Sequence, residues 1–125
     1  MRKLKLLFFM MIVAALVVGC ASAPVFQFNP GLYTGVGQGW AGPIHVTVEV
    51  DNSRILSVTI GQNHETQSIA SAAFDRVPRQ IVERQSVHVD AMAGVTLTVD
   101  GIVEAVTAAL ISAGATEEQL AAGRR

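Results

Sequence analysis

The segment Asp90–Thr98 (DAMAGVTLT) gathers a carboxylate, a glycine and two hydroxyl side chains within nine residues. It follows a short alternating stretch and precedes an apolar stripe of helical spacing, which indicates a strand-to-helix junction. The first N–H groups of a helix lack partners and the helix dipole favours negative charge, so such a junction suits an anion. Gly94 would let a ligand approach the backbone closely, and Thr96 and Thr98 add hydroxyls beside the amides. These residues predict an anion or phosphate site; alternatively, one of the two threonines is only the N-cap of the helix.

The first 19 residues predict a secretory signal peptide. Arg2, Lys3 and Lys5 make the start basic, and Leu6–Val18 then runs without a charge. A spanning helix needs about 20 apolar residues, so this run is too short to cross a bilayer comfortably. A basic start, a short apolar run and small residues after it are typical of a secretory signal.

The end of that signal, Val17–Cys20 (VVGC), is similar to a bacterial lipobox, in which the cysteine is acylated and the chain is cut just before it. Cys20 is the only cysteine, which excludes an internal disulfide framework. We therefore expect acylated Cys20 to anchor the protein to a lipid bilayer. The alternative is an ordinary signal peptide that is cleaved near Ala21–Ala23.

The charge of the mature chain excludes one class of partner. Loss of the three basic residues of the signal leaves six Lys and Arg against ten Asp and Glu, a net charge near −4, and no lysine remains. No basic surface for nucleic acid is predicted. The three histidines are not spaced as a metal site, and we expect His45 and His88 to point outward from strands.

The middle of the chain predicts a small antiparallel sheet. Gly31–Trp40 is rich in glycine but has some strand character. Apolar and polar residues alternate in Ile44–Val50 and again in Leu56–Ile60, and Asp51–Ser53 between them is a turn signal. The last two strands should form a hairpin. Residues 20–30 before the sheet read as an extended, mobile tether, whose Phe26 and Phe28 either pack on the domain or dip toward the membrane.

The rest of the chain predicts helices. Thr66 can cap a helix from Gln67, which should break near Val77 because proline is disfavoured inside a helix, with a second short helix at Pro78–Arg84. A brief strand is expected at Ser86–Val89, and a last helix from Thr98 to a stop at Gly114. The positions expected to face inward are Ile69, Ala73, Val77, Ile81, Val82, Val87, Val89, Ile102, Val103, Val106, Ala109 and Leu110. The fold class is α+β, a small antiparallel sheet with helices packed on one face, over residues 31–114, and 115–125 form a frayed polar tail.

The junction segment resembles the flavinylation motif of the FMN-binding domain family, which occurs in sodium-translocating quinone reductases, fumarate-reductase-like flavoproteins and small secreted lipoproteins. Asp90, Gly94, Thr96 and Thr98 match that motif position by position. Ala93 stands where a hydroxyl residue is common, and Val95 replaces the usual alanine. The similarity extends over roughly residues 31–114 and includes the glycine-rich start, the valine hairpin, the His64–Thr66 segment and the stretch from Pro78 to Asp90.

The resemblance implies a cofactor and its attachment. A magnesium-dependent flavin transferase would cleave FAD and join FMN to the Thr96 hydroxyl as a phosphodiester. The resemblance gives Asp90 a role in recognition by the transferase or in orienting the loop, unless it merely caps a turn. Glu65 and Thr66 would lie near the flavin ring, with Thr66 bonded to it; alternatively, Thr66 is a helix cap and Glu65 is solvated. The residues expected to surround the phosphate are Gly94, Val95, Leu97 and Thr98, and those expected against the ring edge, or else in the core, are Met92 and Leu97.

These expectations define a membrane-anchored electron carrier on the extracytoplasmic face of a bacterial membrane. It would exchange electrons with a membrane or periplasmic redox partner such as a flavoprotein reductase. The alternative is a lipoprotein binding or assembly module that carries no flavin. A stand-alone reductase would need an arginine cluster and a hydride-donor pocket, which the few scattered arginines do not supply.

Overall fold

The computed structural model describes residues 26–122. The signal peptide and Cys20, which the sequence predicts, lie outside the described residues. Within them the elements run β1 (Gly31–Gln38), β2 (Pro43–Val50), β3 (Ile55–Ile60), α2 (Gln67–Arg84), α3 (Thr96–Ser112) and α4 (Glu117–Ala122).

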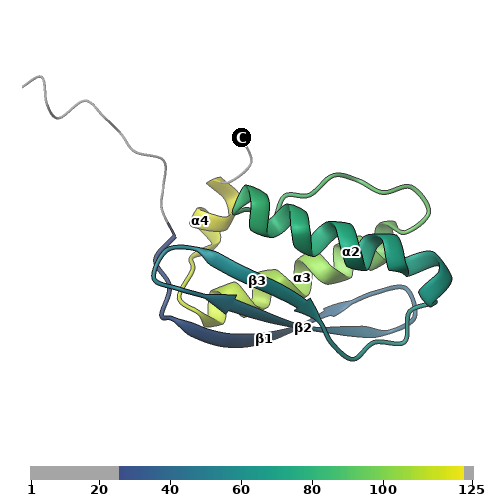
Figure 1. The fold of residues 1–125 in the computed structure, drawn as a ribbon, viewed down its shortest axis with the longest axis horizontal. Helices are drawn as coiled ribbons and strands as arrows, with labels where there is room; N and C mark the ends of the chain where they lie inside the picture. The colour runs from purple at the N-terminus through teal and green to yellow at the C-terminus, as the bar shows by residue number, and fades with distance from the viewer. Residues whose placement is uncertain (1–25, 123–125) are drawn as a thin grey trace, which may run out of the picture.

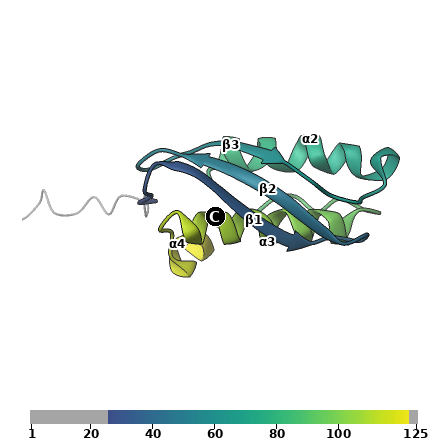
Figure 2. The ribbon, with the colours of Figure 1, turned by 90° about the horizontal axis from the view of Figure 1, so that it is seen from below.

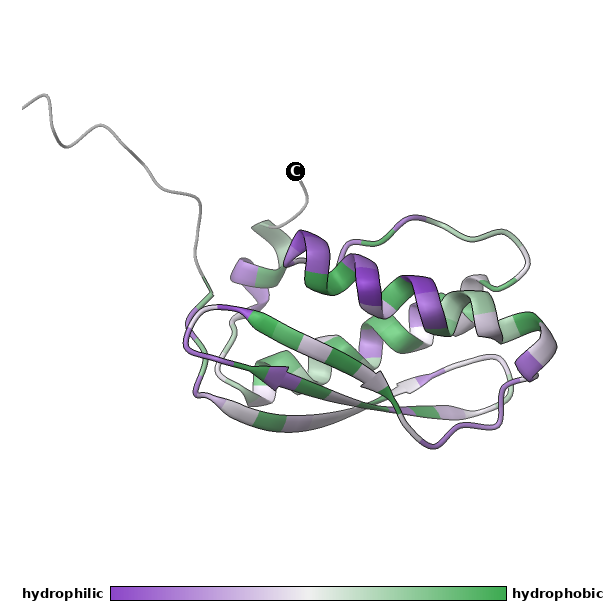
Figure 3. Cartoon of the chain, viewed as in Figure 1, coloured by the Kyte–Doolittle hydropathy of each residue, from purple (hydrophilic) through white to green (hydrophobic). Residues whose placement is uncertain are grey.

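The three strands form one antiparallel sheet in the order β1-β2-β3. The alternation of β2 explains its place at the centre, because every second side chain is buried: Ile44, Val46, Val48 and Val50. The predicted hairpin of β2 and β3 is confirmed, and a register irregularity lies at Glu49/Val50. Figure 3 shows the alternation of hydrophobic and hydrophilic residues along the strands and around α2.

Helices α2 and α3 lie on the same side of the sheet (Figures 1 and 2). Helix α3 packs under β1 and β2, and α2 packs beside β3 and contacts α3. A three-stranded antiparallel sheet with helices on one face confirms the α+β class. The other face of the sheet is open, and it exposes Leu32 and Val36.

Glycines on β1 let α3 lie very close to the sheet. A Cβ atom at Gly35 would be 1.8 Å from the carbonyl oxygen of Ala105, and one at Gly37 would be 1.8 Å from that of Gly101. No side chain fits between these backbones. The glycine-rich sequence of this strand therefore sets the distance between the sheet and the helix that begins at Thr96.

Helix α2 is one continuous helix, so the break expected near Val77 is wrong. Pro78 lies inside it and is half-buried. Proline removes one backbone hydrogen bond, but burial of Val77 and Ile81 on either side holds the helix together. Ile69 was expected to face inward; it is exposed, and Ala70 takes the inward position.

Ser86–Val89 is not a strand, contrary to expectation. The Gln85 side chain instead bonds the end of β3: its Oε1 accepts from the N–H of Ile55 (2.7 Å), and its Nε2 donates to the Ile55 carbonyl (2.9 Å). These bonds occupy the backbone groups of Ile55 with which an added strand would pair. Val87 is nevertheless buried, as predicted, because the loop still packs on the core.

Both ends of the described chain are more ordered than the sequence indicated. Phe26 and Phe28 stack with ring centroids 5.1 Å apart and are buried in the core, which decides between packing and membrane contact for these two residues. At the other end, Glu117–Ala122 is helical and not frayed. Thr116 and Gln119 form a capping box there, and Leu120 is buried.

Candidate functional site

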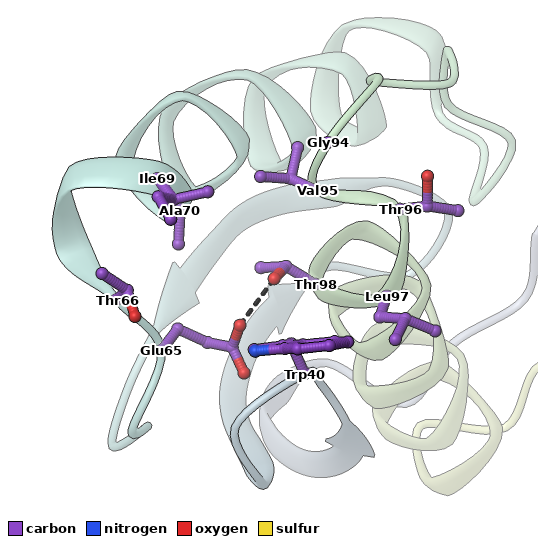
Figure 4. A pocket seen from close by; sticks show the side chains of 10 residues that line it. All are labelled: Trp40, Glu65, Thr66, Ile69, Ala70, Gly94, Val95, Thr96, Leu97 and Thr98. Carbon is purple, nitrogen blue, oxygen red and sulfur yellow. Dashed lines mark hydrogen bonds between the residues drawn. The ribbon is translucent and has the colours of Figure 1, made fainter.

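A cavity of about 430 Å³ opens where three segments meet: the β1–β2 turn, the β3–α2 loop with the first turn of α2, and the start of α3 (Figure 4). Most of its wall is apolar. The residues that line it are Trp40, Glu65, Thr66, Ile69, Ala70, Gly94, Val95, Thr96, Leu97 and Thr98. The structure thus brings together seven of the sequence-predicted site residues and adds Trp40, Ile69 and Ala70.

Thr96 is the first residue of α3, which begins two residues earlier than expected. Val95 is the N-cap and makes no side-chain cap bond, so neither threonine has the capping role that the sequence left open. The Thr96 side chain is exposed, and Figure 4 shows its hydroxyl directed away from the Thr98–Glu65 pair. No acidic side chain lies in the first turn of α3. The exposed hydroxyl therefore stands at the positive end of a helix dipole.

Glu65 is buried, with 7% of its surface exposed, and it links two other parts of the site. The Thr98 hydroxyl donates to Glu65 Oε2 at 2.6 Å, and the N–H of Ala41 donates to Oε1 at 2.8 Å. The alternative of a solvated Glu65 is therefore wrong. Thr66 does occupy the N-cap position of α2, but it makes no side-chain cap bond.

Trp40 lies at the mouth of the cavity and was absent from the residues predicted for the site. It is 74% exposed on the β1–β2 turn, and its indole lies beside Leu97 with the nitrogen end toward Glu65 (Figure 4). A signal was present, because a lone tryptophan stands between glycine-rich stretches. Only the packing of the turn against α3 and the β3–α2 loop reveals which site it faces.

Two predicted site residues, Asp90 and Met92, do not line this cavity. They line a second one of about 250 Å³ on the other side of Thr96. Arg84 donates two hydrogen bonds to the Asp90 carboxylate (3.0 and 2.9 Å), and this pairing lowers the pKa of Asp90 below its ordinary value. Gln80 also bonds Asp90, at its side chain and its N–H. Asp90 therefore fastens the α2–α3 loop to α2. Met92 is half-buried against the core.

One of the two histidines expected to point outward from a strand does not do so. His88 is half-buried in a loop and its Nε2 lies 3.0 Å from the carbonyl oxygen of Leu120, so it joins the loop to α4. His45 does alternate outward on β2, between the buried Ile44 and Val46, although it is half-buried. Among residues 26–122, no cluster of His, Cys, Asp or Glu is arranged to hold a metal ion. Within the same residues no helix has the length and apolar character needed to cross a bilayer.

An apolar cavity at the N-terminus of a helix, with the exposed Thr96 hydroxyl on its rim, is typical of a ligand-binding domain. Residues 39–111 match the FMN-binding domain family, and the protein belongs to that family. It is 34% identical over 94 residues to NADH:acrylate oxidoreductase of Vibrio harveyi. This alignment covers 75% of the present chain and 9% of the Vibrio harveyi protein. It is 31% identical over 80 residues to an uncharacterized protein of Treponema pallidum (strain Nichols). This alignment covers 64% of the present chain and 22% of the Treponema pallidum protein. The chain thus spans only a small part of the length of these relatives, and what it shares with the family is an FMN-binding domain.

Proposed function

We propose that this protein is a lipid-anchored, extracytoplasmic electron carrier whose FMN is joined covalently to Thr96. A magnesium-dependent transferase would transfer the FMN part of FAD to Thr96: the hydroxyl oxygen bonds to the FMN phosphorus and loses its proton, the pyrophosphate bond of FAD breaks, and AMP leaves. The observation that carries the proposal is the position of that hydroxyl, exposed at the first residue of α3 on the rim of an apolar cavity.

The start of α3 suits a phosphodiester. The first N–H groups of a helix have no carbonyl partner within the helix, and they favour an anion there. No acidic side chain in the first turn opposes the charge. Gly94 has φ +84° and open space where a side chain would begin, so the loop before the helix leaves room for a ligand. The mature chain lacks lysine, and backbone N–H groups supply what an ammonium would otherwise provide.

The two cavities beside Thr96 differ in size and lining, and the difference favours one of them for the ring. The larger one has apolar walls that include Trp40, Ile69 and Leu97. Its volume of about 430 Å³ lies within the range of ~300–1,000 Å³ that is usual for small-molecule sites, whereas the smaller one, which Asp90 and Asp100 line, has about 250 Å³. The larger cavity would therefore receive the isoalloxazine ring.

Once bound, the flavin would supply one- and two-electron redox chemistry, and the chain's own residues would hold and insulate it. Thr66 and Thr98 offer hydroxyls at the cavity wall, and Glu65 fixes Thr98 in place. A covalent link keeps the cofactor from being lost outside the cytoplasm, where little free flavin is available to refill a site. The name of the Vibrio harveyi relative, an oxidoreductase, supports a redox role.

The first experiment tests the attachment. Full-length wild type is produced with an active flavin transferase and magnesium, denatured, run on a gel and inspected for flavin fluorescence. We expect a fluorescent band that disappears in Thr96→Ala, and a weaker band in Thr96→Ser because serine keeps the hydroxyl. Thr34→Ala is the matched control, since Thr34 is an exposed threonine on β1.

Two outcomes contradict the proposal. A colourless wild-type band, with the transferase shown to act on another substrate, would favour the alternative of a binding module without flavin. A fluorescent band that persists in Thr96→Ala would mean that another residue carries the cofactor. Peptide mass analysis of the loaded protein identifies the modified residue in that case.

A further inference from the structure

Exposed apolar side chains gather around the mouth of the larger cavity. Among residues 26–122, three large hydrophobic side chains from three separate segments meet there: Trp40 at 74% exposure, Ile69 at 58% and Leu97 at 50%. Exposure of large apolar groups is unfavourable in water, so their convergence at one opening indicates something apolar that covers them. Trp40 has the largest apolar surface of the three.

Hydrogen bonds hold the turn that carries Trp40 at the residue before the tryptophan and at the residue after it. The N–H of Gly39 donates to the Gly42 carbonyl (2.8 Å), and the N–H of Ala41 donates to Glu65 Oε1 (2.8 Å). A Cβ at Gly39 would lie 2.6 Å from that same oxygen, so a side chain at this position would have to displace the Glu65 carboxylate. The other oxygen of Glu65 accepts from Thr98, two residues after the attachment residue.

One buried carboxylate therefore holds the Trp40 turn and the start of α3 at a set distance from each other. An ordinary exposed surface residue does not need its turn to be fixed in this way. It keeps an aromatic face ready at the open side of the cavity, beside Leu97 (Figure 4).

We infer that Trp40 is a flavin-binding residue, whose indole closes the open side of the cavity against the ring that Thr96 carries. The inference rests on the proposed covalent FMN and adds the residue that covers the ring. Stacking of two flat aromatic systems would bury the exposed indole and exclude water from one side of the cofactor. An indole in contact with an excited flavin quenches its fluorescence by electron transfer, which gives a readout independent of catalytic activity.

The experiment compares flavin emission of folded proteins that all carry covalent FMN in equal amount, as judged on the denaturing gel. We expect weak emission from wild type and a several-fold increase in Trp40→Phe and Trp40→Ala. Because Trp40 is the only tryptophan in the chain, no other indole contributes. The matched control is the double variant Trp40→Phe/Leu32→Trp, which moves the indole to a similarly exposed position on the outer face of the sheet. It should remain as bright as Trp40→Phe.

Denaturation of wild type in urea should raise its emission to that of the variants, since the indole then leaves the ring. Equal emission of folded wild type and Trp40→Phe would overturn the inference and leave the covalent attachment intact; Trp40 would then serve another purpose, such as contact with a redox partner. An equally dim Trp40→Phe/Leu32→Trp variant would also overturn it, because contact at the cavity would not be the cause. If the wild-type protein acquires no covalent flavin, both this inference and the proposed function are wrong.

Discussion

At the scale of single residues, the Glu65–Thr98 pair is the centre of the site. It joins a helix and a loop that are 33 residues apart, through a 2.6 Å hydrogen bond in a buried place. A buried carboxylate that loses a partner is left with an unsatisfied oxygen, and this costs more than the bond itself gains. The pair therefore links the stability of the fold to the geometry of the cavity.

Thr98→Val tests that link. Valine keeps the shape of threonine but cannot donate to Glu65 Oε2, so we expect the free energy of unfolding to fall by ~1–3 kcal/mol. Urea unfolding measures the change. Thr107→Val, at a half-buried position of the same helix, is the control and should have a smaller effect. Equal losses in the two variants would mean that the Glu65–Thr98 bond adds nothing.

The Asp90–Arg84 pair predicts a pH dependence. The Arg84 guanidinium lowers the pKa of Asp90 in the folded protein below 3.8, its ordinary value. A carboxylate with a lowered folded pKa adds stability above its unfolded pKa, and this is lost as the pH falls through the folded pKa. The contribution of Asp90 should thus be complete near neutral pH and disappear below about pH 4.

Urea midpoints of wild type and Asp90→Asn, measured from neutral pH down to strong acid, check this. The difference between the two proteins should be largest near pH 7 and shrink below about pH 4. Asp100→Asn, which removes another exposed carboxylate near the same cavity, is the control. A difference between wild type and Asp90→Asn that does not change with pH would contradict the expectation.

At the scale of elements, the contact between α3 and β1 decides where Thr96 stands. The strand has no side chain at Gly35 or Gly37, so the helix lies directly against the sheet backbone. Helix α2 is held differently, by Val77 and Ile81 packing on the core despite Pro78. In α2, tertiary packing overrides the tendency of proline to break a helix. In β1, the absence of side chains at the glycines lets α3 approach the sheet.

Gly35→Ala is expected to be severely destabilising. The new Cβ would fall 1.8 Å from the Ala105 carbonyl oxygen, so α3 must move away from the sheet. Overpacking of this kind costs about 3 kcal/mol or more when backbone must shift. The neighbouring Val36→Ala changes an exposed side chain on the outer face and should alter the free energy by only about 0.5 kcal/mol. Similar urea midpoints for the two variants would disprove the close contact.

At the scale of the whole molecule, the start of the described chain and the β1–β2 turn lie at opposite ends of the domain (Figure 1). Phe28 and Asn29 bond through their N–H groups to the carbonyls of Asn52, at the β2–β3 turn, and Ala113, after α3. The cavity lies at the end with the β1–β2 turn. From Cys20 to Phe26 a fully extended chain would reach at most ~20 Å. An anchor at Cys20 would thus keep the domain near the bilayer with the cavity facing away from it.

The anchor itself is tested by Cys20→Ala, expressed in a bacterial host that processes lipoproteins. We expect the variant to leave the membrane fraction while it still acquires covalent flavin, because the anchor and the cavity are separate. Ser22→Ala, two residues further along, is the control and should remain in the membrane fraction. Retention of Cys20→Ala on membranes would contradict lipid anchoring.

The sequence by itself determined the features that depend on local pattern. The alternation in β2 and β3 predicted their hairpin, and the Asp90–Thr98 segment predicted a strand-to-helix junction whose helix begins at Thr98, two residues after its observed start. Its helix half is confirmed, but Ser86–Val89 is a loop, because Gln85 holds the backbone of Ile55 where a strand would pair. Hydrophobic periodicity indicates which side of a strand or helix is apolar, but it does not indicate which group pairs with the backbone at the edge of a sheet.

Only the tertiary structure decided which residues surround the cavity. Trp40 and Glu65 are 25 positions apart in sequence, and Glu65 and Thr98 are 33 apart. Their meeting depends on how closely α3 packs on β1 and on where the β1–β2 turn then falls. Burial of Phe26 and Phe28 was likewise undecided from the sequence, and the frayed tail predicted around Leu120 was wrong, because all three side chains pack in the core. Local residue types set the strands, the helices and the exposed hydroxyl of Thr96. Long-range packing brought Trp40 to the cavity that Thr96 also lines, because the two residues lie 56 positions apart in the sequence.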